Sequence, residues 1–124
     1  MEPILMMQAA TGLLTVSAVG GLTMAIMRFS GKPQPPTWLA MLHGFLSTAA
    51  LTLLVYAYFT VGLPGMAQFA LVLFLFAAAG GAFINLNFHW KMLPLPKSLV
   101  LAHGGIAVCG FLLLAIATWK VSHV

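Results

Sequence analysis

PTWLAMLHGFLSTAALTLLVYAYFT, residues 36–60, is the stretch that decides the fold, because residues 96–120 repeat its pattern as PKSLVLAHGGIAVCGFLLLAIATWK. Each copy begins with a proline and has a histidine seven residues later, His43 in the first and His103 in the second. A membrane-spanning helix needs about 20 mainly apolar residues, and both copies exceed that length. We therefore expect two equivalent membrane helices, each with one histidine inside the bilayer.

The similarity extends over the whole chain at a constant offset of 60 residues. The coinciding residues are Gly20-Gly21 and Gly80-Gly81, Pro36 and Pro96, Leu39 and Leu99, His43-Gly44 and His103-Gly104, and Leu53-Leu54 and Leu113-Leu114. The sequence therefore predicts a tandem duplication, with repeat 1 at residues 4–60 and repeat 2 at residues 64–120. Both repeats belong to a single integral-membrane domain that covers residues 1–124.

Composition agrees with a membrane location. Of the 124 residues 62% are hydrophobic and only 5% are charged, too few charges to cover the surface of a soluble domain. The net charge of +4 comes from scattered basic residues without a basic run, which argues against nucleic-acid binding. The single cysteine excludes an internal disulfide and covalent heme attachment through a CxxCH motif.

Four segments are long and apolar enough to span a bilayer: residues 4–28, 36–60, 65–88 and 96–120. Short connections favour an all-α, up-down bundle in which sequential helices pack antiparallel. Because each repeat holds an even number of helices, a pseudo-two-fold axis along the membrane normal relates the two copies. The second and fourth helices are then diagonal neighbours, and their histidines face one another.

Basic residues predict the orientation of the bundle. Arg28, Lys32, Lys91 and Lys97 flank the first and third loops, whereas Lys120 alone lies at the other face. The positive-inside rule places loops 29–35 and 89–95 in the cytoplasm and both termini outside, as in a bacterial inner membrane.

The candidate site lies at one level of the bundle, about 10 Å below the cytoplasmic helix ends. Glycine pairs on the first and third helices share this level with the two histidines. The predicted cofactor-binding residues are His43, His103, Gly44, Gly104, Gly20, Gly21, Gly80 and Gly81, and the predicted metal ligands are His43 and His103. Glycine leaves room for the edges of a flat macrocycle, although close helix packing also explains glycines in membrane helices.

Heme is the first ligand to consider, because two neutral imidazoles fill both axial positions of heme iron. A structural hydrogen bond, a quinone, a copper ion and a chlorophyll-type pigment are the alternatives. Zinc needs three or four protein ligands, and no Cys, Asp or Glu lies at this level. The only carboxylate side chain is Glu2, so no catalytic acid-base pair is expected. His89, beside Trp90, is expected to be a solvated interfacial residue rather than a ligand.

The two His-Gly pairs and two Gly-Gly pairs resemble the transmembrane four-helix b-type cytochromes. The resemblance implies one non-covalent heme b with two histidine ligands. This chain lacks the second histidine pair that the two-heme members have. It also implies a non-catalytic electron-transfer or anchor subunit, in contact with partner subunits of a redox complex and with the quinone pool. The competing interpretation is a cofactor-free scaffold subunit. Homo-oligomerisation is compatible with either.

Overall fold

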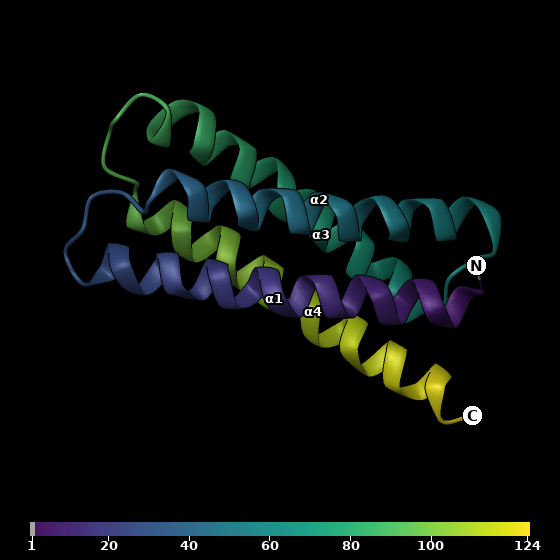
Figure 1. The fold of residues 1–124 in the computed structure, drawn as a ribbon. Coiled ribbons are helices and arrows are strands. Elements are labelled where there is room, and N and C mark those ends of the chain that lie inside the picture. Colours follow the sequence, from purple (N-terminus) through teal and green to yellow (C-terminus); the bar gives the residue numbers. More distant parts are fainter. Residues whose placement is uncertain (1) are drawn as a thin grey trace.

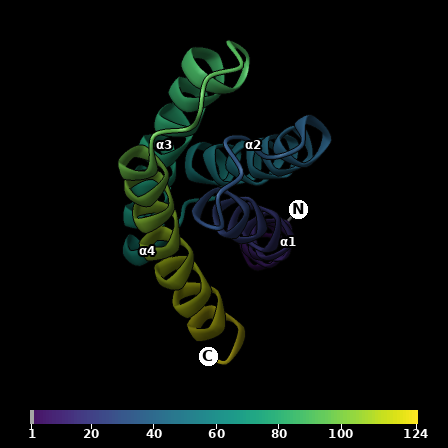
Figure 2. The same ribbon diagram turned by 90° about the vertical axis from the view of Figure 1, so that its left-hand side faces the viewer.

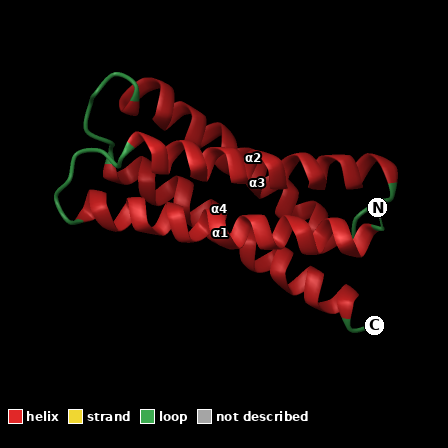
Figure 3. Cartoon of the chain, viewed as in Figure 1, coloured by secondary structure: helices red, strands yellow, loops and turns green. Residues whose placement is uncertain are grey.

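A computed structural model describes residues 2–124 and consists of helices joined by short loops (Figures 1 and 3). The helices are α1 (Pro3–Phe29), α2 (Thr37–Thr60), α3 (Gly65–Ile84) and α4 (Lys97–Ser122), and the π-helical turn η1 (Asn85–His89) continues α3. All four spans, the third counted as Gly65–His89, are long and apolar enough to cross a membrane. Four long apolar helices in the described residues support the prediction of a membrane protein with four spans.

Prolines define where three of the helices begin. Pro36, Pro64 and Pro96 immediately precede α2, α3 and α4. Each accepts the first helical hydrogen bond through its carbonyl oxygen, at 3.0–3.2 Å. Proline has no N–H that would be left unpaired at a helix start. Its ring also clashes with a preceding helical turn, so the helix does not continue on its N-terminal side. The tight turn between α2 and α3 uses Gly62, whose φ of +82° suits glycine.

The two repeats form two antiparallel helix pairs. α1 packs along α2, and α3 packs along α4. Figure 2 shows these pairs as two layers that cross, joined by contacts between α1 and α4 and between α2 and α3. Within the described part of the chain, the backbones of α2 and α4 stay apart, as do those of α1 and α3. The predicted up-down bundle, with α2 and α4 on one diagonal, is confirmed.

The hydrophobic core lies at the end of the bundle next to the α2–α3 turn. Fully buried alanines allow the helices to approach one another closely, as small residues do in membrane bundles. The best-buried members of this core are Met7, Ala10, Ala50, Leu54, Ala57, Ala67, Ala70 and Leu114. The histidines lie toward the other end, between this core and the two longer loops.

Those two loops hold each other in place. The backbone N–H of Leu95 donates to the carbonyl oxygen of Pro33 at 3.1 Å. The side-chain amide of Gln34 donates to the carbonyl of Leu93 at 2.8 Å, and Nε of Arg28 donates to that of Leu95 at 2.7 Å. We call residues 30–36 and 90–96 together the loop cap. The loop cap ties repeat 1 to repeat 2 above the histidines.

Candidate functional site

The structure brings the two repeat-related histidines together. His43 lies on α2 and His103 on α4, two helices whose backbones stay apart. Their ring centres are nevertheless 6.1 Å apart, and the ring planes are inclined at 80°. The two side chains thus span the gap between diagonal helices, as expected for equivalent residues on either side of a pseudo-two-fold axis.

Backbone carbonyls determine which nitrogen of each ring carries hydrogen. Nδ1 of His43 lies 2.8 Å from the carbonyl oxygen of Ser17, and Nδ1 of His103 lies 2.7 Å from that of Ala77. A carbonyl oxygen can only accept, so each Nδ1 must be the donor. In a neutral imidazole the other nitrogen, Nε2, then keeps its lone pair. Metal-binding histidines in proteins are oriented in this way, by a hydrogen bond from the nitrogen that does not bind the metal.

Two of the predicted glycines make room for the imidazoles. A Cβ on Gly21 would lie 2.8 Å from Cε1 of His43, and a Cβ on Gly81 would lie 2.9 Å from Cε1 of His103. Real Cβ atoms essentially never approach a neighbour this closely. Glycine therefore lets each ring lie against the backbone of the preceding helix, within reach of its carbonyl. The sequence interpretation had assigned this space to the edge of a macrocycle.

The other predicted glycines are less constrained. A Cβ on Gly20 would make only ordinary contacts, 3.7 Å from Leu39 and 3.9 Å from His43. Nothing lies within 4 Å of a Cβ built on Gly44, Gly80 or Gly104. These four residues lie at the level of the histidines but do not shape the imidazole positions, and their predicted contact with a cofactor stays a prediction.

A pair of serines distinguishes the first half-site from the second. The Ser17 hydroxyl is hydrogen-bonded to the Ser47 hydroxyl and lies 2.9 Å from Nδ1 of His43. The equivalent positions in repeat 2 are Ala77 and Ala107. Ser17 was not among the predicted site residues. The signal that could have found it is a difference between the repeats, because these positions are polar in repeat 1 and apolar in repeat 2.

His89 is not where the sequence placed it. The prediction of a solvated residue is wrong, because the side chain is only 6% exposed. Its Nε2 lies 3.1 Å from the carbonyl of Pro35, and its buried Nδ1 has no hydrogen-bond partner. The equivalent residue in repeat 1, Phe29, is 43% exposed. His89 therefore contacts the loop cap rather than the solvent.

The π-turn η1 explains this inward position. The N–H of Trp90 donates to the carbonyl of Asn85 at 2.9 Å, a bond that encloses one more residue than an α-helical turn. The extra residue rotates the side chain of His89 relative to the equivalent place on α1, which stays α-helical to Phe29. Patterns of apolar residues do not reveal a single π-turn, so it could not be predicted from the sequence.

The basic residues at this end have different surroundings. Arg28 is partly buried and bound to the loop cap, and the amino group of Lys97 lies 5.6 Å from the centre of the Phe29 ring. Lys32 and Lys91 are exposed. Arg28 thus has a structural contact beyond the orientation role that the positive-inside rule assigns to it.

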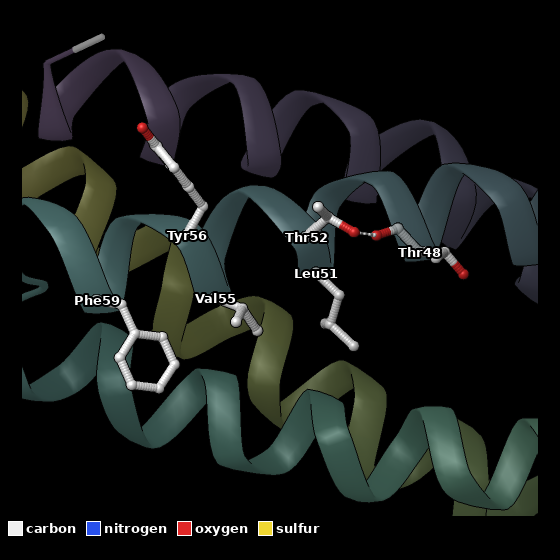
Figure 4. A pocket seen from close by; sticks show the side chains of 6 residues that line it. All are labelled: Thr48, Leu51, Thr52, Val55, Tyr56 and Phe59. Carbon is white, nitrogen blue, oxygen red and sulfur yellow. Dashed lines mark hydrogen bonds between the residues drawn. The ribbon is translucent and has the colours of Figure 1, made fainter.

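Two shallow hollows on the surface are separate from the histidines. One follows α2 from Thr48 to Phe59, and Figure 4 shows its apolar lining and the Thr52 hydroxyl, which donates to the Thr48 carbonyl at 2.8 Å. Another on α3 is lined by Val72, Leu75, Phe76 and Ala79. Both are open and apolar, as expected of surfaces that face lipid acyl chains.

The chemistry of the donor set limits what the site can hold. Within residues 2–124, no three or more His, Cys, Asp and Glu side chains come together as a metal site. Two imidazole nitrogens are too few for the usual tetrahedral zinc site, whereas they supply both axial ligands of a heme. The residues present therefore fit a heme better than a zinc ion.

Comparison of the chain with known protein families, with curated proteins and with solved structures found no match. The resemblance to four-helix b-type cytochromes thus stays a prediction that the histidine geometry must support.

Proposed function

We propose that this protein is a small integral-membrane cytochrome b that binds one heme non-covalently between His43 and His103. The observation that carries the proposal is the geometry of this pair. The ring centres are 6.1 Å apart, and both Nδ1 atoms are engaged with backbone carbonyls. Each Nε2 therefore keeps its lone pair, and the two rings lie close together between the repeats.

The separation of the rings suits two ligands of one metal. A metal bond to a histidine nitrogen is about 2 Å long, and that nitrogen lies about 1 Å from its ring centre, so ligands on opposite sides have ring centres about 6 Å apart. The observed 6.1 Å agrees with this value. A direct hydrogen bond between the rings would need a donor, but Nε2 of each neutral ring is an acceptor.

The proposed role is electron transfer rather than catalysis. His43 and His103 would hold the heme as its two protein ligands, and the heme would supply a one-electron couple. The chain contributes the two ligands, their orientation by Ser17 and Ala77, and a membrane interior that excludes water. We propose that it serves as an electron-transfer or anchor subunit of a membrane redox complex, exchanging electrons with partner subunits or a quinone.

The proposed location is a bacterial inner membrane with the loop cap in the cytoplasm. The support is the concentration of basic residues at that face, namely Arg28, Lys32, Lys91 and Lys97. Both termini would then lie outside, and the heme would be nearer to the cytoplasmic surface.

A visible spectrum tests the proposal directly. The full chain, purified in detergent and supplied with hemin, is expected to show a reduced-minus-oxidised spectrum of a low-spin b-type heme. His43→Ala and His103→Ala should each abolish the low-spin spectrum while circular dichroism shows the helices intact. His123→Ala is the matched control, because His123 is exposed at the end of α4.

Other outcomes favour the competing functions. Folded protein that retains no hemin after the unbound hemin is removed overturns the cytochrome and favours a scaffold subunit. A pigment with long-wavelength absorbance in the purified protein favours a chlorophyll-type ligand, and a co-purifying quinone lost in both histidine variants favours a quinone site. Hemin binding that neither histidine substitution alters also overturns the proposed site.

A further inference from the structure

The half-sites of the two repeats differ at two positions that touch or adjoin the histidines. Positions 17 and 47 are serines in repeat 1, and the equivalent positions 77 and 107 are alanines in repeat 2. The backbone carbonyls at positions 17 and 77 nevertheless bind the two Nδ1 atoms almost identically, at 2.8 and 2.7 Å. The chemical difference between the half-sites is therefore confined to the serine hydroxyls.

The Ser17 hydroxyl contacts the hydrogen-bonding edge of His43. Ser17 is only 2% exposed, and its Oγ lies 2.9 Å from Nδ1 of His43 and 3.1 Å from the carbonyl oxygen of His43. It is also bonded to the hydroxyl of Ser47 one turn along α2. The serine pair thus forms a small buried polar network around one imidazole only.

The direction of these bonds follows from the donors available. Nδ1 of His43 carries one hydrogen, which faces both the carbonyl oxygen and the hydroxyl oxygen of Ser17. The hydroxyl oxygen therefore accepts, and its own hydrogen is directed to the His43 carbonyl or to Ser47. His43 has two acceptors at Nδ1, whereas His103 has only the Ala77 carbonyl.

We infer that Ser17, supported by Ser47, makes His43 the more strongly donating of the two axial ligands and thereby lowers the reduction potential of the bound heme. The inference rests on the proposed function. An acceptor at Nδ1–H draws that hydrogen away from the ring and raises the basicity of the ligand nitrogen. A more basic ligand stabilises the oxidised iron, which carries the greater positive charge. Ser17 is therefore a positioning and tuning residue that does not touch the cofactor itself.

A purely structural role is the alternative. Serine hydroxyls in membrane helices often satisfy a neighbouring carbonyl, and the Ser17 contact with the His43 carbonyl would do so. In that case Ser17→Ala changes stability but leaves the heme potential and the Nδ1 hydrogen unchanged. The two roles thus differ in quantities that can be measured.

A redox titration of the heme-loaded full chain provides the main test. Ser17→Ala is expected to raise the midpoint potential, so that at a fixed potential the ratio of oxidised to reduced heme falls about threefold, equivalent to about 28 mV for a one-electron couple. Ser17→Thr keeps the hydroxyl and should restore the wild-type potential. Thr48→Ala is the matched control, because its hydroxyl on α2 donates to Gly44 and not to His43.

A variant that adds the serine pair to repeat 2 tests the same inference in case Ser17→Ala fails to fold. The Ala77→Ser/Ala107→Ser variant transplants the serine pair to the second half-site and should lower the potential. In the heme-free protein, ¹⁵N-edited NMR should show the Nδ1–H proton of His43 moving upfield in Ser17→Ala, with that of His103 unmoved. If heme binds and its potential is unchanged in Ser17→Ala and in Ala77→Ser/Ala107→Ser, this inference is overturned and the proposed function stands. Wild-type protein that binds no heme overturns the proposed function as well.

Discussion

Gly81 lies against the imidazole of His103 so closely that a Cβ on the glycine would be 2.9 Å from Cε1 of the ring. Gly21 has the same relationship to His43 in the other repeat, at 2.8 Å. Helix packing alone would not require glycine at the same place in both copies. The shared contact indicates that the ring position, and with it the direction of Nε2, is what each glycine maintains.

Substituting either glycine should therefore weaken the site. In Gly21→Ala or Gly81→Ala the imidazole must move away from the carbonyl that orients it, with an overpacking cost of about 1–3 kcal/mol. We expect hemin affinity to fall about tenfold or more, the usual effect of losing an outer hydrogen bond to a metal ligand. Gly12→Ala is the control, since Gly12 lies on α1 outside the predicted site and a Cβ there meets nothing within 4 Å. Equal affinities in Gly12→Ala and Gly21→Ala would contradict the assignment.

Free imidazole should replace a deleted ligand. His43→Gly removes one axial nitrogen but leaves the space that its ring occupied, so the bound heme should lose its low-spin spectrum and regain it when imidazole is added. His103→Gly should behave in the same way, because the two half-sites are equivalent in geometry. Visible spectroscopy across an imidazole titration measures the effect. A His43→Gly protein that keeps the low-spin spectrum without imidazole would exclude His43 as a ligand.

The π-turn predicts that His89 is protected from chemical modification. His89 is 6% exposed beneath the loop cap, whereas His123 is exposed. Because modification of a buried ring requires local opening, diethylpyrocarbonate should label His89 about tenfold or more slowly than His123. Mass spectrometry quantifies both sites. Deleting Leu86, within η1, should convert the π-turn to an α-helical turn and accelerate labelling of His89, and unchanged protection would argue against this role for η1.

The orientation of the bundle can be tested with single cysteines in a Cys109→Ala background. Ser30 and Ser98 lie at the loop-cap face, and Thr60 lies at the α2–α3 turn. An impermeant thiol reagent should label Thr60→Cys in intact cells, and Ser30→Cys and Ser98→Cys only in inverted vesicles, as the positive-inside rule predicts. The opposite pattern would reverse the orientation. Labelling of Ser30→Cys and Thr60→Cys from the same side would contradict the four spans.

Much of the fold could be predicted from particular residues. Pro36, Pro64 and Pro96 limit the helices because proline interrupts the hydrogen-bonding pattern on its N-terminal side, and the observed starts follow them directly. The predicted spans agree with the observed helices to within two residues at each end. The juxtaposition of His43 and His103 followed from the repeat and from an even number of helices in each half.

The details of the site could not be predicted in the same way. The contacts of Gly21 and Gly81 with the imidazoles depend on the crossing of neighbouring helices, which residue spacing along one helix does not specify. Ser17 was overlooked because it belongs to the first helix and meets His43 only through packing. His89 was placed wrongly because it belongs to a π-turn, which changes the direction in which its side chain leaves the helix.

The sequence by itself therefore determined the apolar character of the chain, its four spans, their duplication and the position of each histidine along its helix, because these depend on apolar length and on a regular rise along each helix. Only the tertiary structure decided which nitrogen of each ring is free, which half-site carries a second acceptor and where His89 points. Hydrogen bonds between segments decide these features of the histidines. Such bonds form only when atoms from segments far apart in the chain lie within about 3 Å of each other.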